Sequence, residues 1–141
     1  MASYVKYENF VEDLGLGVHD FSSSGHTLKV MLTLSAPDAA SDAVKADISE
    51  ISAGNGYAAG GEDAQNEYTR SGGTATLSCQ DVVWTASGGA IADFRYVHLY
   101  NDTPTSPTDP LISYWDYGAT VTMNVGETFT VDFGASTFTI T

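Results

Sequence analysis

Basic side chains are scarce in this sequence. Its 141 residues include five Lys and Arg against 18 Asp and Glu, which leaves a formal net charge of −13. A protein that binds nucleic acid needs a basic surface to release counterions from the phosphates, and anionic membranes attract the same kind of surface. The charge therefore predicts a protein that binds neither nucleic acid directly nor a membrane.

Cysteine and long apolar runs are also scarce. Cys79 is the single cysteine, so no internal disulfide is expected, and its place in the alternating run Ala75, Leu77, Cys79 predicts a small buried side chain. No apolar run approaches the length of about 18 residues that a membrane helix needs. Residues 1–13 lack the apolar segment of a signal peptide, so we expect the protein to be made in the cytosol and not exported by that route.

Motifs that carry chemistry are missing as well. The sequence contains no nucleophile elbow, no phosphate-binding P-loop and no HExxH zinc motif. Gly54-Asn-Gly-Tyr-Ala-Ala59 imitates a dinucleotide fingerprint, but no strand and helix flank it, so we interpret it as a loop whose glycines need positive φ. His19, His26 and His98 lack metal-ligand spacing, and a packed, hydrogen-bonded role is expected for His98. We predict that the protein is not an enzyme, with no catalytic, cofactor-binding or metal-binding residues and no cofactor.

The N-terminal residues show helical periodicity. Apolar side chains recur there at spacings of three and four: Tyr4, Tyr7, Phe10, Val11 and Leu14. Ser3 is positioned to cap the start, and the glycines that follow Leu14 end the pattern. We predict an N-terminal helix over residues 1–14.

From residue 27 onward the apolar pattern has a period of two, which indicates strands. The expected strands lie at 27–35, 74–79, 81–86, 91–100, 111–117, 119–125, 127–133 and 136–141. The apolar parity changes after Cys79, which predicts a bulge or turn at Gln80-Asp81. Residues 1–141 are therefore expected to form a single all-β domain, an antiparallel sandwich or barrel of about eight strands over 27–141 with the helix in front.

Aromatic side chains gather in two neighbouring strand regions: Tyr96, Tyr100, Tyr114, Trp115 and Tyr117. One interpretation is a platform that stacks on a sugar. The other is that these rings fill the core and an interface between subunits, where Tyr and Trp are favoured. The segment 111–117 carries bulky side chains on both faces, which favours the second interpretation.

Several segments along nearly the whole chain, in order, resemble a family of small structural proteins of tailed phages. They are residues 46–61, 84–102, 110–118 and 125–133, together with the opening helix and the strand after it. The role best supported in that family is that of a head cement, or decoration, protein. The resemblance implies a jelly-roll sandwich without catalytic residues, which binds the outer surface of the capsid and stabilises the lattice of the major capsid protein.

The resemblance also implies partners and a location. The expected partners are the major capsid protein and further copies of the chain, as a dimer or trimer. The expected location is the exterior of the capsid in the virion, after synthesis in the bacterial cytoplasm. The alternative is a carbohydrate- or receptor-binding module of a phage tail, in which Trp84 or Trp115 would stack on a sugar.

The docking surface is a separate hypothesis. Tyr4, Tyr7 and Phe10 are the candidate interface residues, because a helix beside an otherwise all-β domain must cover either its own sheet or a neighbouring molecule. The sequence leaves both possibilities open.

Overall fold

A five-stranded antiparallel sheet forms one layer of the protein. In the computed structural model, which describes residues 2–141, its strands are hydrogen-bonded in the order β1-β8-β7-β2-β3. Their bounds are β1 Tyr4–Lys6, β2 Leu28–Thr33, β3 Glu62–Asp63, β7 Ile91–Asn101 and β8 Leu111–Met123. The long hairpin of β7 and β8 sets the length of this sheet.

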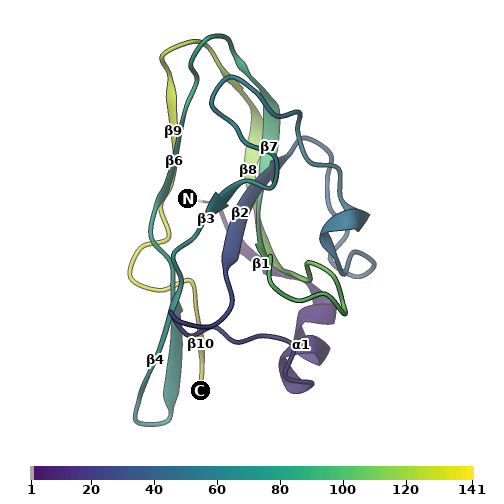
Figure 1. Cartoon of the computed structure of the whole chain (residues 1–141), viewed down its shortest axis with the longest axis vertical. Coiled ribbons are helices and arrows are strands. Elements are labelled where there is room, and N and C mark those ends of the chain that lie inside the picture. The colour runs from purple at the N-terminus through teal and green to yellow at the C-terminus, as the bar shows by residue number, and fades with distance from the viewer. Residues whose placement is uncertain (1) are drawn as a thin grey trace.

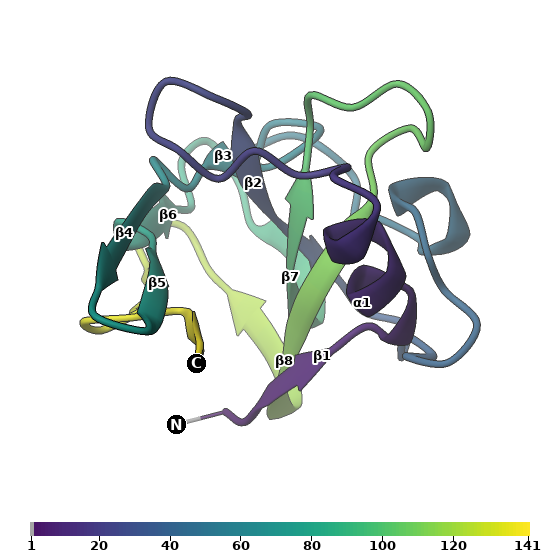
Figure 2. The same ribbon diagram turned by 90° about the horizontal axis from the view of Figure 1, so that it is seen from below.

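A second layer of shorter strands faces this sheet. It contains β4 (Glu67–Ser71), β5 (Thr74–Ser78) and β10 (Phe138–Ile140) in the order β10-β5-β4, and the separate pair β6 (Val82–Thr85) and β9 (Thr128–Val131). Figures 1 and 2 show these strands together on one side of the molecule. The all-β class with one short helix, predicted from the sequence, is confirmed, while the jelly-roll connectivity stays a prediction.

The opposite face of the five-stranded sheet is covered as well. Helix α1 (Glu8–Gly15) and the loop with the short 3-10 turn η1 (Lys45–Asp47) lie on the side away from the second layer (Figure 2). β2 therefore buries side chains on both of its faces, although its sequence pattern predicted a strand buried on one face only. The buried residues are Leu28, Val30, Met31, Leu32 and Thr33.

The N-terminal segment differs from the predicted helix. Tyr4–Lys6 is an edge strand paired with β8, and the helix begins only at Glu8. Tyr7 occupies the N-cap position without a side-chain capping bond, so Ser3 does not cap the helix. The spacing of Tyr4 fits a helix only by coincidence, because the edge of β8 offers hydrogen-bond partners to the segment Tyr4–Lys6, and such tertiary pairing overrides a local pattern.

The period-two pattern located most of the strands. β2, β5, β6, β7, β9 and β10 agree with predicted ranges to within a few residues, and the chain changes sheets near Gln80-Asp81, where the turn was expected. The strands expected at 111–117 and 119–125 form the single strand β8, which continues through Gly118 at a φ of 95°. β3 and β4 were not predicted, because few apolar residues alternate in them.

Candidate functional site

The three predicted interface residues do not lie together on the surface. Tyr7 and Phe10 are 0% and 3% exposed, whereas Tyr4 is 36% exposed. Phe10 packs against Phe21 and Phe138, with ring centroids 6.1 and 5.6 Å away. Tyr7 and Phe10 therefore hold the helix against the protein's own core, which is one of the two possibilities that the sequence left open. Only Tyr4 is accessible to a partner.

Tyr7 belongs to a buried chain of hydrogen bonds with His98 and Thr33. Its hydroxyl lies 2.8 Å from His98 Nδ1, and Thr33 Oγ1 lies 2.7 Å from His98 Nε2. Because the Thr33 hydroxyl donates to the Ser35 carbonyl oxygen, we assign the imidazole proton to Nε2, which leaves Nδ1 to accept from Tyr7. Burial lowers the pKa of His98 to about 3, so the ring is neutral. The predicted packed, hydrogen-bonded histidine is confirmed.

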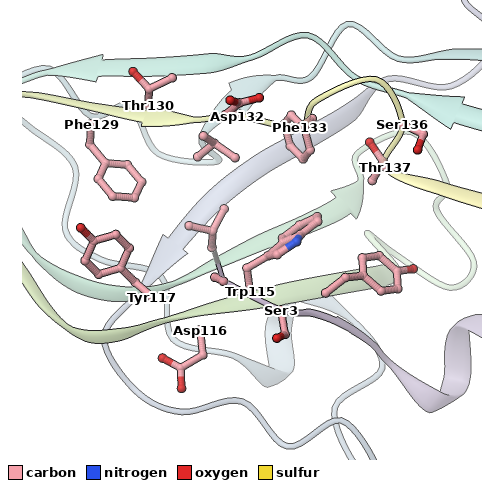
Figure 3. A pocket seen from close by; sticks show the side chains of 14 residues that line it. Ser3, Trp115, Asp116, Tyr117, Phe129, Thr130, Asp132, Phe133, Ser136 and Thr137 are labelled. Atoms are coloured by element: carbon pink, nitrogen blue, oxygen red, sulfur yellow. The ribbon is translucent and has the colours of Figure 1, made fainter.

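A cleft of about 780 Å³ opens between the two layers. One wall is formed by β8 and the residues that lead into β1, and the other by β9 and the turn that leads to β10 (Figure 3). The lining residues are Ala2, Ser3, Tyr4, Val97, Trp115, Asp116, Tyr117, Phe129, Thr130, Val131, Asp132, Phe133, Ser136 and Thr137. Because residues 2–4, 115–117 and 129–137 are far apart in the sequence, the cleft exists only in the folded protein.

Aromatic pairs connect the two walls of the cleft. Trp115 meets Phe133 and Tyr117 meets Phe129, with ring centroids 5.5 and 5.6 Å apart in edge-to-face geometry (Figure 3). Tyr4 packs edge-on against Trp115 at 5.6 Å, and burial raises the pKa of its hydroxyl to about 12. Such pairs stabilise by about 0.5–1.5 kcal/mol beyond area burial. They fix the walls, with Phe133 buried, Trp115 and Phe129 half-buried and Tyr117 exposed to the solvent.

The charged groups that line the cleft are carboxylates. Asp116 accepts two hydrogen bonds from Arg95, with Nε–Oδ1 and Nη2–Oδ2 distances of 2.8 and 3.0 Å, and this contact holds the pKa of Asp116 below its usual range. Asp132 accepts the N–H of Gly134 at 2.8 Å, and no basic side chain within residues 2–141 forms an ion pair with it. The uncompensated charge of the cleft is therefore at Asp132.

The sequence identified only part of this site. Trp115 and Tyr117 belong to the aromatic group that the sequence singled out, and both line the cleft, whereas Tyr96 and Tyr100 are buried. Phe129 lies in the strand expected at 127–133, but nothing in the sequence pattern indicates which strand lies opposite it. That information comes from the stacking of two layers, which no local pattern encodes.

Two other features singled out in the sequence have structural roles. Four glycines of the loop at 54–61 have positive φ, and a Cβ on Gly61 would collide with the Val30 carbonyl oxygen, so the interpretation as a glycine-dependent loop is confirmed. Cys79 is 6% exposed, as predicted for a small buried side chain. Burial raises the pKa of its thiol to about 11.

A second pocket, of about 360 Å³, lies between η1 and the loop before β8. Its Lys45 forms an ion pair with Glu50 at 3.6 Å and lies over the Tyr100 ring, 5.5 Å from the centroid, so these charges are already engaged. Over residues 2–141, no group of three or more His, Cys, Asp and Glu residues is arranged to hold a metal ion. No helix in the same range is long and apolar enough to cross a membrane.

Comparison with known proteins gives no relative at a significant level: no family model, no curated protein and no solved structure matches the chain.

Proposed function

We propose that the protein is a structural virion protein of the head-cement class, which binds the outer surface of a phage capsid and stabilises the major capsid protein lattice. The observation that carries the proposal is the exposed aromatic cleft, since Tyr, Trp and Phe are enriched at the centres of protein interfaces. Tyr117 leaves 57% of its surface exposed at the cleft. The resemblance to that family of several sequence segments, in the same order along the chain, supports the same function.

The framework around the cleft favours binding of this kind. The central strands β2 and β7 of the five-stranded sheet are mostly buried, and aromatic contacts join the two walls. A binding surface that is already ordered loses little conformational entropy when a partner docks. The cleft walls therefore need no rearrangement to present Trp115 and Tyr117.

A repeating lattice also lets modest contacts act together. A protein that binds only the assembled shell stabilises it by mass action, and a dimer or trimer that contacts several capsid subunits at once gains from effective concentration. We propose self-association for this reason, and no chemical reaction or cofactor is part of the function. The net charge of −13 keeps free copies soluble and discourages binding to DNA.

Reconstitution on phage heads tests this function. Purified protein is mixed with heads from which the native decoration has been stripped, and bound copies per capsomer are counted after sedimentation. We expect saturable binding at a fixed ratio and a higher temperature of head disruption. Absence of saturable binding, or binding only to isolated tails, would contradict the proposal.

A second candidate function is a carbohydrate-binding module of a phage tail. Tyr117 is favoured for it because it is more than half exposed and its ring packs edge-on against Phe129 in the cleft, which leaves ring surface for stacking on a sugar. Trp84 is 1% exposed, so it has no surface for a sugar. Glycan-array binding that is lost in Tyr117→Ala, together with no binding to heads, would favour this candidate.

A further inference from the structure

The cleft runs along the edges of strands. Five consecutive residues, Phe129–Phe133, line one wall, although successive side chains of a strand point to opposite faces. Figure 3 shows Phe129 and Phe133 pointing into the cleft, with Thr130 and Asp132 on the other side of the strand, so a cleft that reaches all five passes along the edge of β9 as well as its inner face. The other wall likewise uses consecutive residues, Trp115–Tyr117 and Ala2–Tyr4. The cleft is thus a slot between the edges of the two layers.

The edge of β9 that faces the slot is unpaired within residues 2–141, because β9 pairs with β6 on one side only. Ala86 N–H donates to the Glu127 carbonyl oxygen at 2.9 Å. The Glu127 N–H donates within the turn to the Asn124 carbonyl oxygen, and by the alternation of an antiparallel ladder Phe129 and Val131 turn their backbone groups toward β6. Thr130 turns its N–H and C=O the other way, and such free groups are a template for an added strand.

The facing edge of β8 is less suited to pairing. β7 aligns Tyr96 with Asp116 but Phe94 with Val121, so β8 bulges between Asp116 and Val121, and Gly118 within the bulge has a φ of 95°. Bulges of this kind interrupt the regular row of donors and acceptors that an added strand needs. β9 therefore offers the regular edge.

We propose that an extended, basic segment of the capsid lattice subunit enters the slot and adds to β9 at Thr130; this inference rests on the proposed function. The segment residue opposite Thr130 exchanges backbone hydrogen bonds with it. The two neighbours of that segment residue point inward, where Phe129, Val131 and Trp115 offer apolar surface. Residues one step farther out lie beside Thr128 and Asp132.

The negative charge of the slot favours a segment with positive charge. The lining residues contain carboxylates but no Lys or Arg, and the whole chain carries −13. Arg95 already pairs with Asp116 at 2.8 Å, which leaves Asp132 for a cation on the segment. Opposite charges on adjacent strands stabilise and like charges destabilise, and the net charge steers a basic segment toward the protein.

A short peptide serves as the probe. In capped Lys-Val-Thr-Val-Lys, the valines take the inward positions and the lysines the outward ones when the central threonine pairs with Thr130. Titrated into the 15N-labelled full chain, it should shift the amide resonances of residues 128–133 first. Two control peptides should each bind about tenfold more weakly than this parent peptide: the same sequence with an N-methyl group on the central threonine, and the peptide Glu-Val-Thr-Val-Glu.

A matched pair of protein variants tests the edge from the other side. Thr130→Pro removes only an outward-facing N–H, which edge strands tolerate, whereas Thr130→Ala keeps that N–H and removes the side chain. We expect Thr130→Pro to weaken both peptide binding and head binding about tenfold, and Thr130→Ala to leave both nearly unchanged. If Thr130→Pro fails to fold, the N-methylated peptide tests the other hydrogen bond of the same pair, from the peptide N–H to the Thr130 carbonyl oxygen.

Several results would overturn the inference. The first is that the N-methylated peptide binds as tightly as the parent peptide. The second is that the parent peptide shifts the amide resonances of residues other than 128–133. The third is that the parent peptide shifts no resonances, whether or not maltohexaose shifts the cleft amides instead. Loss of a dimer in Thr130→Pro but not in Thr130→Ala would show that a second copy fills the slot. If heads bind both variants equally, strand addition is wrong while the proposed function stands. If wild-type protein binds the peptide but no heads, the proposed function fails instead.

Discussion

At the scale of single residues, His98 is the group that we expect to make the folded protein less stable in acid. Its ring nitrogens contact the hydroxyls of Tyr7 and Thr33, and no carboxylate is among these partners. Burial lowers its pKa to about 3, whereas an imidazole in the unfolded chain has a pKa of about 6.5. Between these two values the unfolded chain binds a proton that the native protein does not, so acid favours unfolding.

We expect the free energy of unfolding to fall as the pH drops below about 6.5, by up to about 1.4 kcal/mol per pH unit from His98. The contribution of the neutral ring is complete above that pH and is lost down to about pH 3. His19, whose pKa burial lowers to about 4, acts in the same direction. Urea unfolding at about pH 7 and about pH 5 measures the change.

The variant His98→Gln separates this effect from the titration of carboxylates. Glutamine can hydrogen-bond to Tyr7 and Thr33 but does not titrate. We expect the variant to be less stable than wild type near pH 7 and to lose less stability on acidification. Equal pH slopes in the two proteins would show that His98 is not the responsible group.

At the scale of elements, helix α1 fastens the N-terminal segment to the core. Its inner side carries Phe10, whereas Val11 beside it is 56% exposed. Tyr7, at the N-cap, is fully buried against Tyr114 and His98. Removing residues 1–14 would therefore delete part of the core as well as strand β1, so such a truncation tests folding before it tests docking.

Two neighbouring substitutions on α1 distinguish a packing role from a docking role. Phe10→Ala should lower the free energy of unfolding by about 3–5 kcal/mol, because it leaves a cavity among aromatic rings. Val11→Ala should change it by no more than about 0.5 kcal/mol, as expected for an exposed site. Urea denaturation measures both. A small loss in Phe10→Ala would contradict the burial of this ring.

The elements also show what sequence can and cannot predict. Alternating apolar residues predicted β2, β5, β6, β7, β9 and β10. One face of each of these strands meets the core, and successive side chains point to opposite faces, so apolar residues recur in the sequence with a period of two. β1 was missed because Tyr4 satisfies a helical spacing, while the strand that contains it pairs with β8, where Tyr4 aligns with Trp115 more than a hundred residues away. The two-residue strand β3 pairs through its backbone alone, so its acidic side chains give no signal.

The site was harder to predict than the elements for a related reason. Trp115 and Tyr117 were noticed as part of an aromatic group, but their partners Phe133 and Phe129 come from a different layer. A sequence pattern assigns each ring to a face of its own strand. Which two faces meet, and where they leave an opening, depends on how the layers stack.

At the scale of the whole molecule, the sandwich presents an aromatic slot on an acidic body. Exposed apolar residues also occur away from the slot, such as Val83 on β6 and Val125 in the turn before β9, and an exposed apolar residue by itself is ordinary on protein surfaces. The slot instead gathers several rings from two layers around one opening. It is therefore the surface through which we expect the molecule to adhere to a lattice.

Binding isotherms on stripped phage heads test this adhesion most directly, with wild-type protein, Tyr117→Ala and Val83→Ala compared at one salt concentration. Tyr117 and Val83 are both more than half exposed, but only Tyr117 lines the slot. We expect Tyr117→Ala to raise the dissociation constant about tenfold or more, as for a central aromatic contact, and Val83→Ala to match wild type. Unchanged binding in Tyr117→Ala, or an equal loss in both variants, would contradict adhesion through the slot.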